Sequence, residues 1–282
     1  MSCLVGLAEW RLPVTGIEAV RLTASVGADG LQLDLGGPGR GEWIDTPGRI
    51  EALRAEAGER GVRLLALGGN HFNDIGLTTE PETVRPLLQR LLDAAVALRV
   101  PLVFVPSFRR SAIDGPEALT RTAAVLRWAA VQAQQRGLVL ANENVLTGEQ
   151  ARVLADEVGS SSFRLVLDTF NPVVAGLRTD ALVASLADLL ADQVHLKDGP
   201  PDRGPSPLLG AGTGRLAETL TMLRVHRVPV HAFVLENDYR GAGTTLLAAD
   251  DDHRDADAGR LAADLAWARR RARQMTSTGA GA

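Results

Sequence analysis

Short apolar segments alternate with longer amphipathic segments along almost the whole chain. The short segments are CLVGLA (3–8), GLQLDL (30–35), RLLALG (63–68), PLVFVP (101–106), LVLANE (138–143), RLVLDT (164–169), QVHLK (193–197) and VHAFVLE (230–236). Their length and their β-branched and apolar content predict strands. Between them, segments such as ETVRPLLQRLLDAAVALR carry apolar residues at helical spacing, which predicts helices.

This alternation predicts an α/β protein in which parallel strands are joined by helical crossovers. Eight strands favour a closed (β/α)8 TIM barrel, formed as a single domain by residues 1–273. An open doubly wound sheet is the alternative fold, and it requires one or two of the predicted strands to be absent. The small and polar residues 274–282 are expected to form a disordered tail.

Composition narrows the classes of protein that this barrel can represent. The 282 residues carry a formal net charge of −4, which argues against a nucleic-acid-binding face. Apolar runs are interrupted by Arg or Asp, and the segment MSCLVGLAEW lacks the basic start of a signal peptide. A single cysteine, Cys3, excludes an internal disulfide framework. We therefore expect a cytoplasmic protein without nucleic-acid or membrane partners.

Ionisable residues end four successive predicted strands. Strands five to eight end near Glu143, Asp168, His195 and Glu236, and active sites of TIM barrels lie at the carboxyl ends of the strands. Three carboxylates and one imidazole suit one divalent ion such as Mn, Mg or Co, which also relieves the repulsion between the carboxylates. The alternative is that each residue merely begins a solvated loop, but four on consecutive strands favour a metal site.

Lys197 is the only lysine of the chain, and it follows His195 by two residues. Alternation along a strand places both side chains on the same face, so Lys197 is expected at the mouth of the barrel. Its ammonium group is predicted to contact a substrate oxygen or to balance the acids. A salt bridge to Asp198 or to a neighbouring carboxylate is the alternative.

Other polar residues follow the first three strands at the same predicted rim. Asn70 and His71, in GGNHFND, are candidates for substrate contacts, with hydrogen bonds to the backbone as the alternative. Asp34 ends strand two and either contacts substrate or caps a turn. The segment 9–11 follows strand one, where Trp10 is suited to line the face of a sugar.

Two irregular loops follow the seventh strand. Arg203 lies in GPPDRGPSP, which we predict closes over the substrate, with an ordinary surface loop as the alternative. The run GAGTG (210–214) offers backbone N–H groups to a phosphate, as loops near strands seven and eight of barrels often do.

The motifs resemble those of the xylose isomerase-like TIM-barrel superfamily. The pair Glu143-Asn144, DTFN (168–171), VHLKD (194–198) and VLEN (234–237) occur in its order and spacing, and the resemblance covers residues 3 to about 273. It implies that Glu143, Asp168, His195 and Glu236 bind one divalent ion. It also implies that the two glutamates exchange protons with a carbon next to a carbonyl.

The chain departs from this superfamily at two positions. Ketose 3-epimerases usually have a histidine three residues after the strand-six aspartate, whereas Asn171 stands here. The glycine-rich stretch after strand seven usually ends near an acidic residue, whereas Arg215 stands here. Both departures count against epimerisation of a free ketose and leave the metal ligands in place. Asn171 stays a candidate for contact with substrate.

We therefore predict a metal-dependent isomerase or epimerase that acts on a small polyhydroxylated carbonyl compound, namely a sugar, a sugar phosphate or a cyclitol-like ketone. Glu143 and Glu236 are the predicted catalytic residues, and relatives often form homo-oligomers. The alternatives are a metal-dependent lyase like the 3-dehydroshikimate dehydratases and a non-catalytic barrel that binds a metabolite or a partner protein. The DNA-repair endonucleases of the superfamily are excluded because their multi-metal cluster needs more histidines than the five present.

Overall fold

Eight parallel strands close into a barrel in the order of the sequence. The computed structural model describes residues 2–200, 208–241 and 256–276. The strands are β1 (Leu4–Ala8), β2 (Gly30–Asp34), β3 (Arg63–Gly68), β4 (Leu102–Pro106), β5 (Val139–Glu143), β6 (Phe163–Asp168), β7 (Leu190–Leu196) and β8 (Ala232–Leu235). The closed barrel is confirmed, and the open sheet is wrong because β1 pairs with β8.

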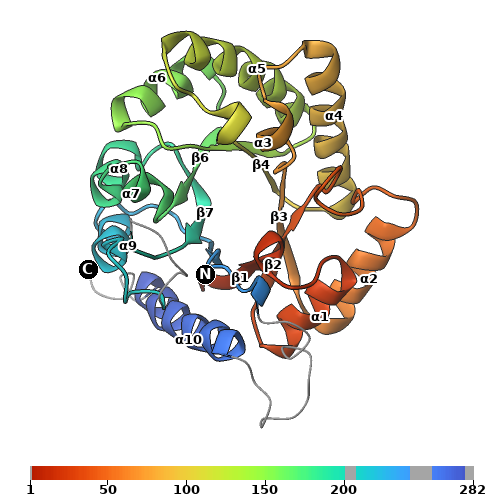
Figure 1. Ribbon diagram of the computed structural model, residues 1–282, viewed down its shortest axis with the longest axis vertical. Coiled ribbons are helices and arrows are strands. Elements are labelled where there is room, and N and C mark those ends of the chain that lie inside the picture. Colours follow the sequence, from red (N-terminus) through yellow and green to blue (C-terminus); the bar gives the residue numbers. More distant parts are fainter. Residues whose placement is uncertain (1, 201–207, 242–255, 277–282) are drawn as a thin grey trace.

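Helices form a ring around the strands (Figure 1). They are α1 (Ile17–Ser25), α2 (Arg49–Arg60), α3 (Phe72–Ile75), α4 (Pro81–Leu98), α5 (Pro116–Gln135), α6 (Gly148–Val158), α7 (Asn171–Val174), α8 (Thr179–Leu186), α9 (Leu216–Val225) and α10 (Ala256–Thr276), with 3₁₀ turns η1 (Glu9–Arg11) and η2 (Arg109–Ser111). The last helix extends to Thr276 and thus enters the segment 274–282 that was expected to be a tail. Residues 277–282 lie outside the described part of the chain.

Apolar residues of the strands alternate between two packing layers. Outward residues such as Leu31, Val103 and Leu196 pack under the helices in one large buried cluster. The inside of the barrel is filled by a smaller set that includes Phe104 and several alanines. A Cβ at Gly68 would lie 2.6 Å from Cζ of Phe104, so this glycine makes room for the ring. The interior is therefore packed, and the substrate site has to lie above it.

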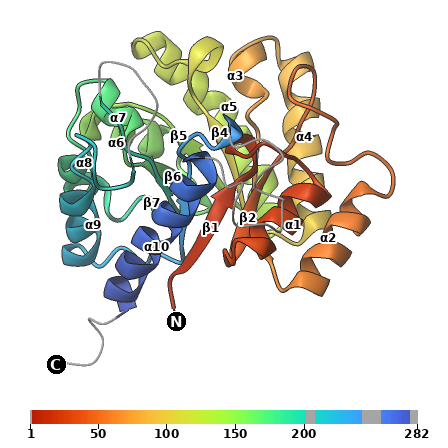
Figure 2. The same cartoon turned by 60° about the horizontal axis from the view of Figure 1, so that its bottom comes forward.

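At the rim, four strands end one residue before the predicted position, namely β2, β6, β7 and β8. The strand β7 begins at Leu190, three residues earlier than predicted, because an irregularity in the pairing with β6 absorbs extra residues. Lys197 and Glu236 lie directly after the ends of β7 and β8. Figure 2 shows the short helices α3 and α7 at the end of the barrel toward which the strands point. Among the described helices, we find none with the length and apolar character of a membrane span.

Candidate active site and metal centre

Four ionisable side chains meet at the carboxyl end of the barrel. Each of the four offers one ligand atom, and these atoms lie within 4.8 Å of one another; the residues are Glu143, Asp168, His195 and Glu236. All four are buried, with exposed fractions of 4% or less. The register of the strands explains the meeting, because Asp168 of β6 lies directly beside His195 of β7. The sequence correctly predicted that these side chains would converge.

Three of these residues aim buried atoms without a hydrogen-bond partner at the same place. The atoms are Oδ2 of Asp168, Nδ1 of His195 and Oε2 of Glu236. Leaving such atoms buried and unpaired costs free energy, so their convergence indicates a ligand that satisfies all of them at once. A donor set of three carboxylates and one imidazole fits a divalent ion. The four residues could therefore hold one such ion.

A buried chain of amides sets the orientation of the His195 ring. Nε2 of His195 lies 2.9 Å from Oε1 of Gln32, whose Nε2 donates to Oε1 of Gln193. The amide of Gln193 in turn donates to the backbone oxygen of Leu65 at 2.8 Å. A backbone oxygen can only accept, so it fixes both amides and requires His195 to donate from Nε2. Nδ1 is then the ring atom that faces the carboxylates, as a metal ligand must.

The charge on the His195 ring depends on the carboxylates around Nδ1. This atom lies 3.4 Å from Oε2 of Glu236 and 3.6 Å from Oε2 of Glu143, longer than a normal hydrogen bond. Burial alone lowers the pKa of His195, but the two glutamates raise it to about 10 in the metal-free protein. The two glutamates thus favour a proton at Nδ1, and a divalent ion bound at this atom would have to displace that proton.

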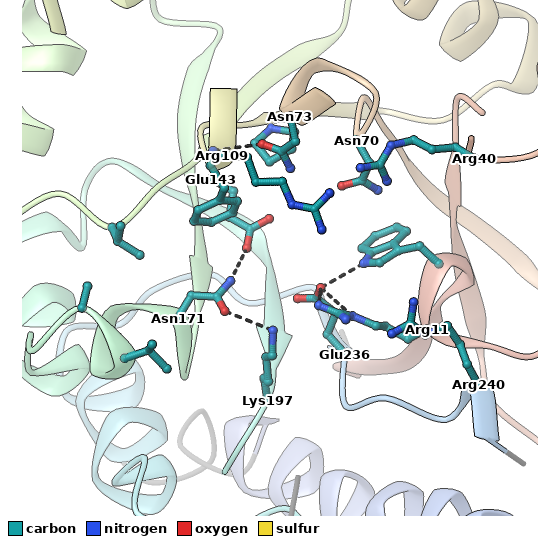
Figure 3. A pocket seen from close by; sticks show the side chains of 16 residues that line it. Arg11, Arg40, Asn70, Asn73, Arg109, Glu143, Asn171, Lys197, Glu236 and Arg240 are labelled. Atoms are coloured by element: carbon teal, nitrogen blue, oxygen red, sulfur yellow. Dashed lines mark hydrogen bonds and ion pairs between the residues drawn. The ribbon is translucent and has the colours of Figure 1, made fainter. Parts of the chain in front are cut away.

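Trp10 and Arg11, in the turn η1 that follows β1, hold Glu236 as an anion. Its Oε1 accepts hydrogen bonds from Nε1 of Trp10 at 2.9 Å and from Nε and Nη2 of Arg11 at 3.1 and 2.9 Å (Figure 3). Burial raises the pKa of Glu236, but the charges of Lys197, Arg11 and His195 hold it well below its usual value. Trp10 and Arg11 thus orient a carboxylate, which the sequence did not reveal.

Glu143 is positioned through Asn171 and Lys197. Nδ2 of Asn171 donates to Oε1 of Glu143 at 3.1 Å, and Nζ of Lys197 donates to Oδ1 of Asn171 at 3.0 Å (Figure 3). The residue before the glutamate, Asn142, faces outward and donates to the backbone oxygen of Val105 and to Oγ of the β4–η2 loop residue Ser107. These bonds fix the end of β5, so that Glu143 points into the barrel mouth. Within the described residues, Lys197 makes no ion pair within 4 Å.

Asp168 combines a turn with a ligand position. Its Oδ1 accepts the backbone N–H groups of Phe170 and Asn171 at 2.7 and 2.5 Å, which closes the turn that starts α7. Burial raises the pKa of Asp168 to about 7, while Lys197 opposes the rise. The motif DTFN therefore leaves Oδ2 free for a ligand.

A cavity of about 460 Å³ opens above these residues. Glu143, Glu236, Asn171 and Lys197 line it together with Asn70, and the further polar residues on its wall are Arg11, Arg40, Asn73, Arg109 and Arg240. Figure 3 shows these side chains around one central space. Four arginines on one cavity form a basic wall above an acidic floor. Arg40, Arg109 and Arg240 were not identified from the sequence, although the first two follow predicted strands two and four.

The other predicted residues differ in their relation to this cavity. Asn70 lines it, whereas the His71 ring packs edge-on against Trp43, with ring centres 5.4 Å apart. Asp34 is half-buried near Glu9, and desolvation together with the Glu9 charge raises the pKa of Asp34 to about 7. Arg203 lies outside the described residues.

The glycine run after β7 does not present its N–H groups to the cavity. The buried carboxylate of Asp198 accepts the backbone N–H groups of Gly210, Gly212 and Gly214 at 2.9, 3.1 and 3.1 Å. Phosphate binding by GAGTG was the less favoured interpretation of the sequence, and these three N–H groups are already used by an internal anion. Arg215 pairs with Asp180 at 3.3 Å.

Comparison with known proteins assigns the family. The profile of the xylose isomerase-like TIM barrel family matches residues 20–271. Over 272 residues, the chain is 58% identical to a 2-epi-5-epi-valiolone 7-phosphate 2-epimerase of Actinoplanes sp., and the match covers 96% of each protein.

Solved structures share the fold at low sequence identity. A D-allulose 3-epimerase from Methylomonas sp. in complex with D-allulose has a TM-score of 0.71 at 19% identity, over 96% of this chain and 97% of that one. A D-psicose 3-epimerase from Clostridium cellulolyticum H10 has a TM-score of 0.71 at 17% identity, over 95% of this chain and 98% of that one. The chain therefore belongs to the xylose isomerase-like TIM barrel family and is an enzyme of the sugar isomerase and epimerase type.

Proposed function

We propose that the protein is a metal-dependent epimerase that inverts the carbon next to the ketone of a phosphorylated polyhydroxylated ketone. The expected substrate is 2-epi-5-epi-valiolone 7-phosphate, inverted at C2, as the name of the 58% identical relative states for that enzyme. The metal is expected to be Mn, Mg or Co. A cytoplasmic location and a homo-oligomeric state remain predictions from the sequence.

One observation supports this proposal above the others. Two carboxylates, those of Glu143 and Glu236, lie on the floor of one cavity, with Oε2 atoms 3.6 and 3.4 Å from the same atom, Nδ1 of His195. Inversion of a carbon needs a base on one face and an acid on the other. Two glutamates that reach one centre from different strands, β5 and β8, suit this requirement.

The proposed reaction moves protons between these glutamates and the substrate. One carboxylate removes the proton from the carbon next to the ketone, and the other, in its acid form, returns a proton to the opposite face. The acid and the base exchange their protonation states, which solvent must reset before the next turnover. The bound divalent ion would supply positive charge to the ketone oxygen and its neighbouring hydroxyl while negative charge develops.

The hydrogen bonds of the two glutamates suit these steps. Glu143 accepts one bond from a neutral amide, that of Asn171, so protonation of its carboxylate disturbs little. Glu236 accepts three bonds from Trp10 and Arg11, which keep its carboxylate in one orientation. An asparagine suits the position of Asn171 because it orients Glu143 without taking part in proton transfer.

The test is incubation of the metal-loaded protein with 2-epi-5-epi-valiolone 7-phosphate, followed by NMR and mass spectrometry of the product. The expected product is the C2 epimer with unchanged mass, formed by wild type and by a control variant, Glu149→Gln, in an exposed helix turn. Glu143→Gln and Glu236→Gln should each lose at least about 100-fold in kcat. Loss of a water molecule from the substrate would instead support the dehydratase alternative, and no conversion with any of the three metals would contradict the proposal.

A further inference from the structure

Two arginines on the cavity wall share a single carboxylate. Arg40, from the β2–α2 loop, donates from Nε and Nη2 to the two oxygens of Asp74 at 2.5 and 3.1 Å. Arg109, from η2, donates from Nη1 to Oδ1 of Asp74 at 3.1 Å. Both guanidinium groups therefore contact the same oxygen, and both line the cavity that holds Glu143 and Glu236 (Figure 3).

The elements that carry this group are tied together beneath it. Oγ of the buried Ser111 donates to the backbone oxygen of Phe72 and accepts the N–H of Leu77, both at 2.7 Å. Oδ1 of Asn73 accepts the backbone N–H of Phe108 at 2.9 Å. These bonds join α3, which carries Asp74, to the turn that carries Arg109. The backbone that carries Arg109 is thus fixed relative to Asp74.

The backbone of Arg109 is itself unusual. Its φ of 50° lies in the left-handed region, which costs a non-glycine residue about 1 kcal/mol or more. Arg99 and Arg227, which also have positive φ, follow the C-terminal ends of α4 and α9, where such angles are common, and Arg215 lies directly before α9. Arg109 instead lies in a 3₁₀ turn at the rim of the cavity, and strain of this kind is typical of functional sites.

The charges on this wall favour an anion. Two guanidinium cations contact the carboxylate of Asp74, and Nη1 of Arg40 also lies 3.9 Å from Oδ2 of Asp34. Burial raises the pKa of Asp34 to about 7, so near neutral pH its charge balances that of Arg40 only in part. Arg240 on the same wall is already paired through two hydrogen bonds to Asp238, and Arg11 is paired with Glu236. Arg109 is 71% exposed and donates only one hydrogen bond to Asp74, so most of its N–H groups face the open space.

We propose that Arg40 and Arg109, held by Asp74, form an anion clamp that binds the phosphate group of the substrate. A phosphomonoester carries a charge between −1.5 and −2 near neutral pH and accepts forked hydrogen bonds from guanidinium groups. The clamp lies on the wall, while the acids lie on the floor, so a ketone phosphate can place its reacting carbon below and its phosphate above. This inference rests on the proposed function and adds the residues that select phosphorylated ketones.

Two measurements test the clamp. The first compares Arg109→Gly with Arg110→Ala, which is its matched control. Glycine accepts the left-handed backbone, so the first variant removes the guanidinium without new strain. Arg110 is exposed in the same turn and does not line the cavity, and its replacement removes the same charge. Calorimetric titration of the metal-loaded proteins with inorganic phosphate should show affinity lowered at least 10-fold by Arg109→Gly and less than 2-fold by Arg110→Ala. Equal affinities in the three proteins, or no phosphate binding by wild type, would overturn the clamp.

The second measurement is kinetic. With the phosphorylated ketone, Arg109→Gly should lower kcat/KM about 100-fold, mainly through KM, whereas activity on the unphosphorylated ketone should change less than 3-fold. An equal loss on both ketones would overturn the clamp and leave the epimerase proposal intact. If wild type converts neither ketone, the proposed function fails, and the phosphate titration still decides whether the clamp exists.

Discussion

Nε2 of His195 lies 2.9 Å from Oε1 of Gln32 inside the barrel. The two residues come from β7 and β2, which β8 and β1 separate in the barrel, and both are fully buried. Because the amide of Gln32 is itself fixed through Gln193 and a backbone oxygen, the imidazole has one orientation and one donor atom. The lower interior of the barrel thus determines which ring atom reaches the metal centre.

Gln32→Met is expected to weaken metal binding about 10- to 100-fold, the usual effect of removing a partner of a metal ligand. Methionine has a similar shape but offers no strong acceptor, so the ring is free to adopt the other tautomer. Competition with a coloured chelator measures the affinity, and ¹⁵N NMR of the histidines reports the protonated ring atom. Gln135→Met, at the exposed end of α5, is the control. An unchanged metal affinity together with an unchanged His195 tautomer would show that the amide chain has no such role.

Asn171→Leu is expected to lower kcat about 10- to 100-fold while the protein still binds its metal. The variant removes both bonds of the amide, to Glu143 and to Lys197, with little change in volume. Steady-state kinetics and metal analysis of the same preparation are the measurements. If kcat is unaffected, the orientation of Glu143 does not depend on Asn171.

Asp34 should make the metal-free protein less stable as the pH rises. Its pKa is about 7 in the folded protein, against the usual 3.8, so the folded state prefers the protonated form. The resulting stability is complete below about pH 3.8 and is lost as the pH rises through about 7. At pH 8.5, Asp34→Asn should therefore raise the free energy of unfolding by about 2–4 kcal/mol, since one pKa unit corresponds to about 1.4 kcal/mol.

Urea denaturation at pH 4.5 and pH 8.5 measures this effect. The gain from Asp34→Asn should be much smaller at pH 4.5, and Asp114→Asn, an exposed position, should give no such pH-dependent gain. An Asp34→Asn gain of the same size at both pH values would mean that the aspartate does not titrate in this range.

Gly212→Ala is expected to destabilise the fold by about 1–3 kcal/mol, the usual cost of overpacking. A Cβ at this position would lie 2.6 Å from Cγ of Asp198 and 2.8 Å from the backbone nitrogen of Gly199. Thermal unfolding measures the effect. Gly58 lies on the exposed face of α2, and no atom lies within 4 Å of a Cβ added there. Gly58→Ala should therefore raise the free energy of unfolding by about 0.5–1 kcal/mol. Equal effects of the two substitutions would contradict the role assigned to the glycine run.

The fold was largely predictable because strands and helices leave periodic signals. All eight predicted strands occur, since each buries apolar residues on two faces, and the four residues of the metal centre could be placed because strand ends meet at one rim. Boundaries were less predictable: β7 begins early because of an irregularity in its pairing with β6. A pairing defect of this kind has no local sequence signal.

The walls of the cavity could not be predicted in the same way. Arg40 and Arg109 belong to loops, and their positions depend on Asp74, a residue distant in sequence from both. Gln32 had a weaker signal, because alternation with Gly30 and Asp34 places it inside the barrel. The role of the glycine run could not be assigned, because the sequence does not show that the carboxylate of Asp198 folds back into it.

The most direct test of the proposed epimerisation is proton exchange with solvent. We would incubate the metal-loaded wild type and Glu143→Gln with 2-epi-5-epi-valiolone 7-phosphate in D₂O and follow the C2 position by NMR. Wild type should form the epimer with deuterium at C2, and Glu143→Gln should lose at least about 100-fold in rate. Epimer formed without deuterium at C2, or an unchanged rate in Glu143→Gln, would contradict proton transfer through the two glutamates.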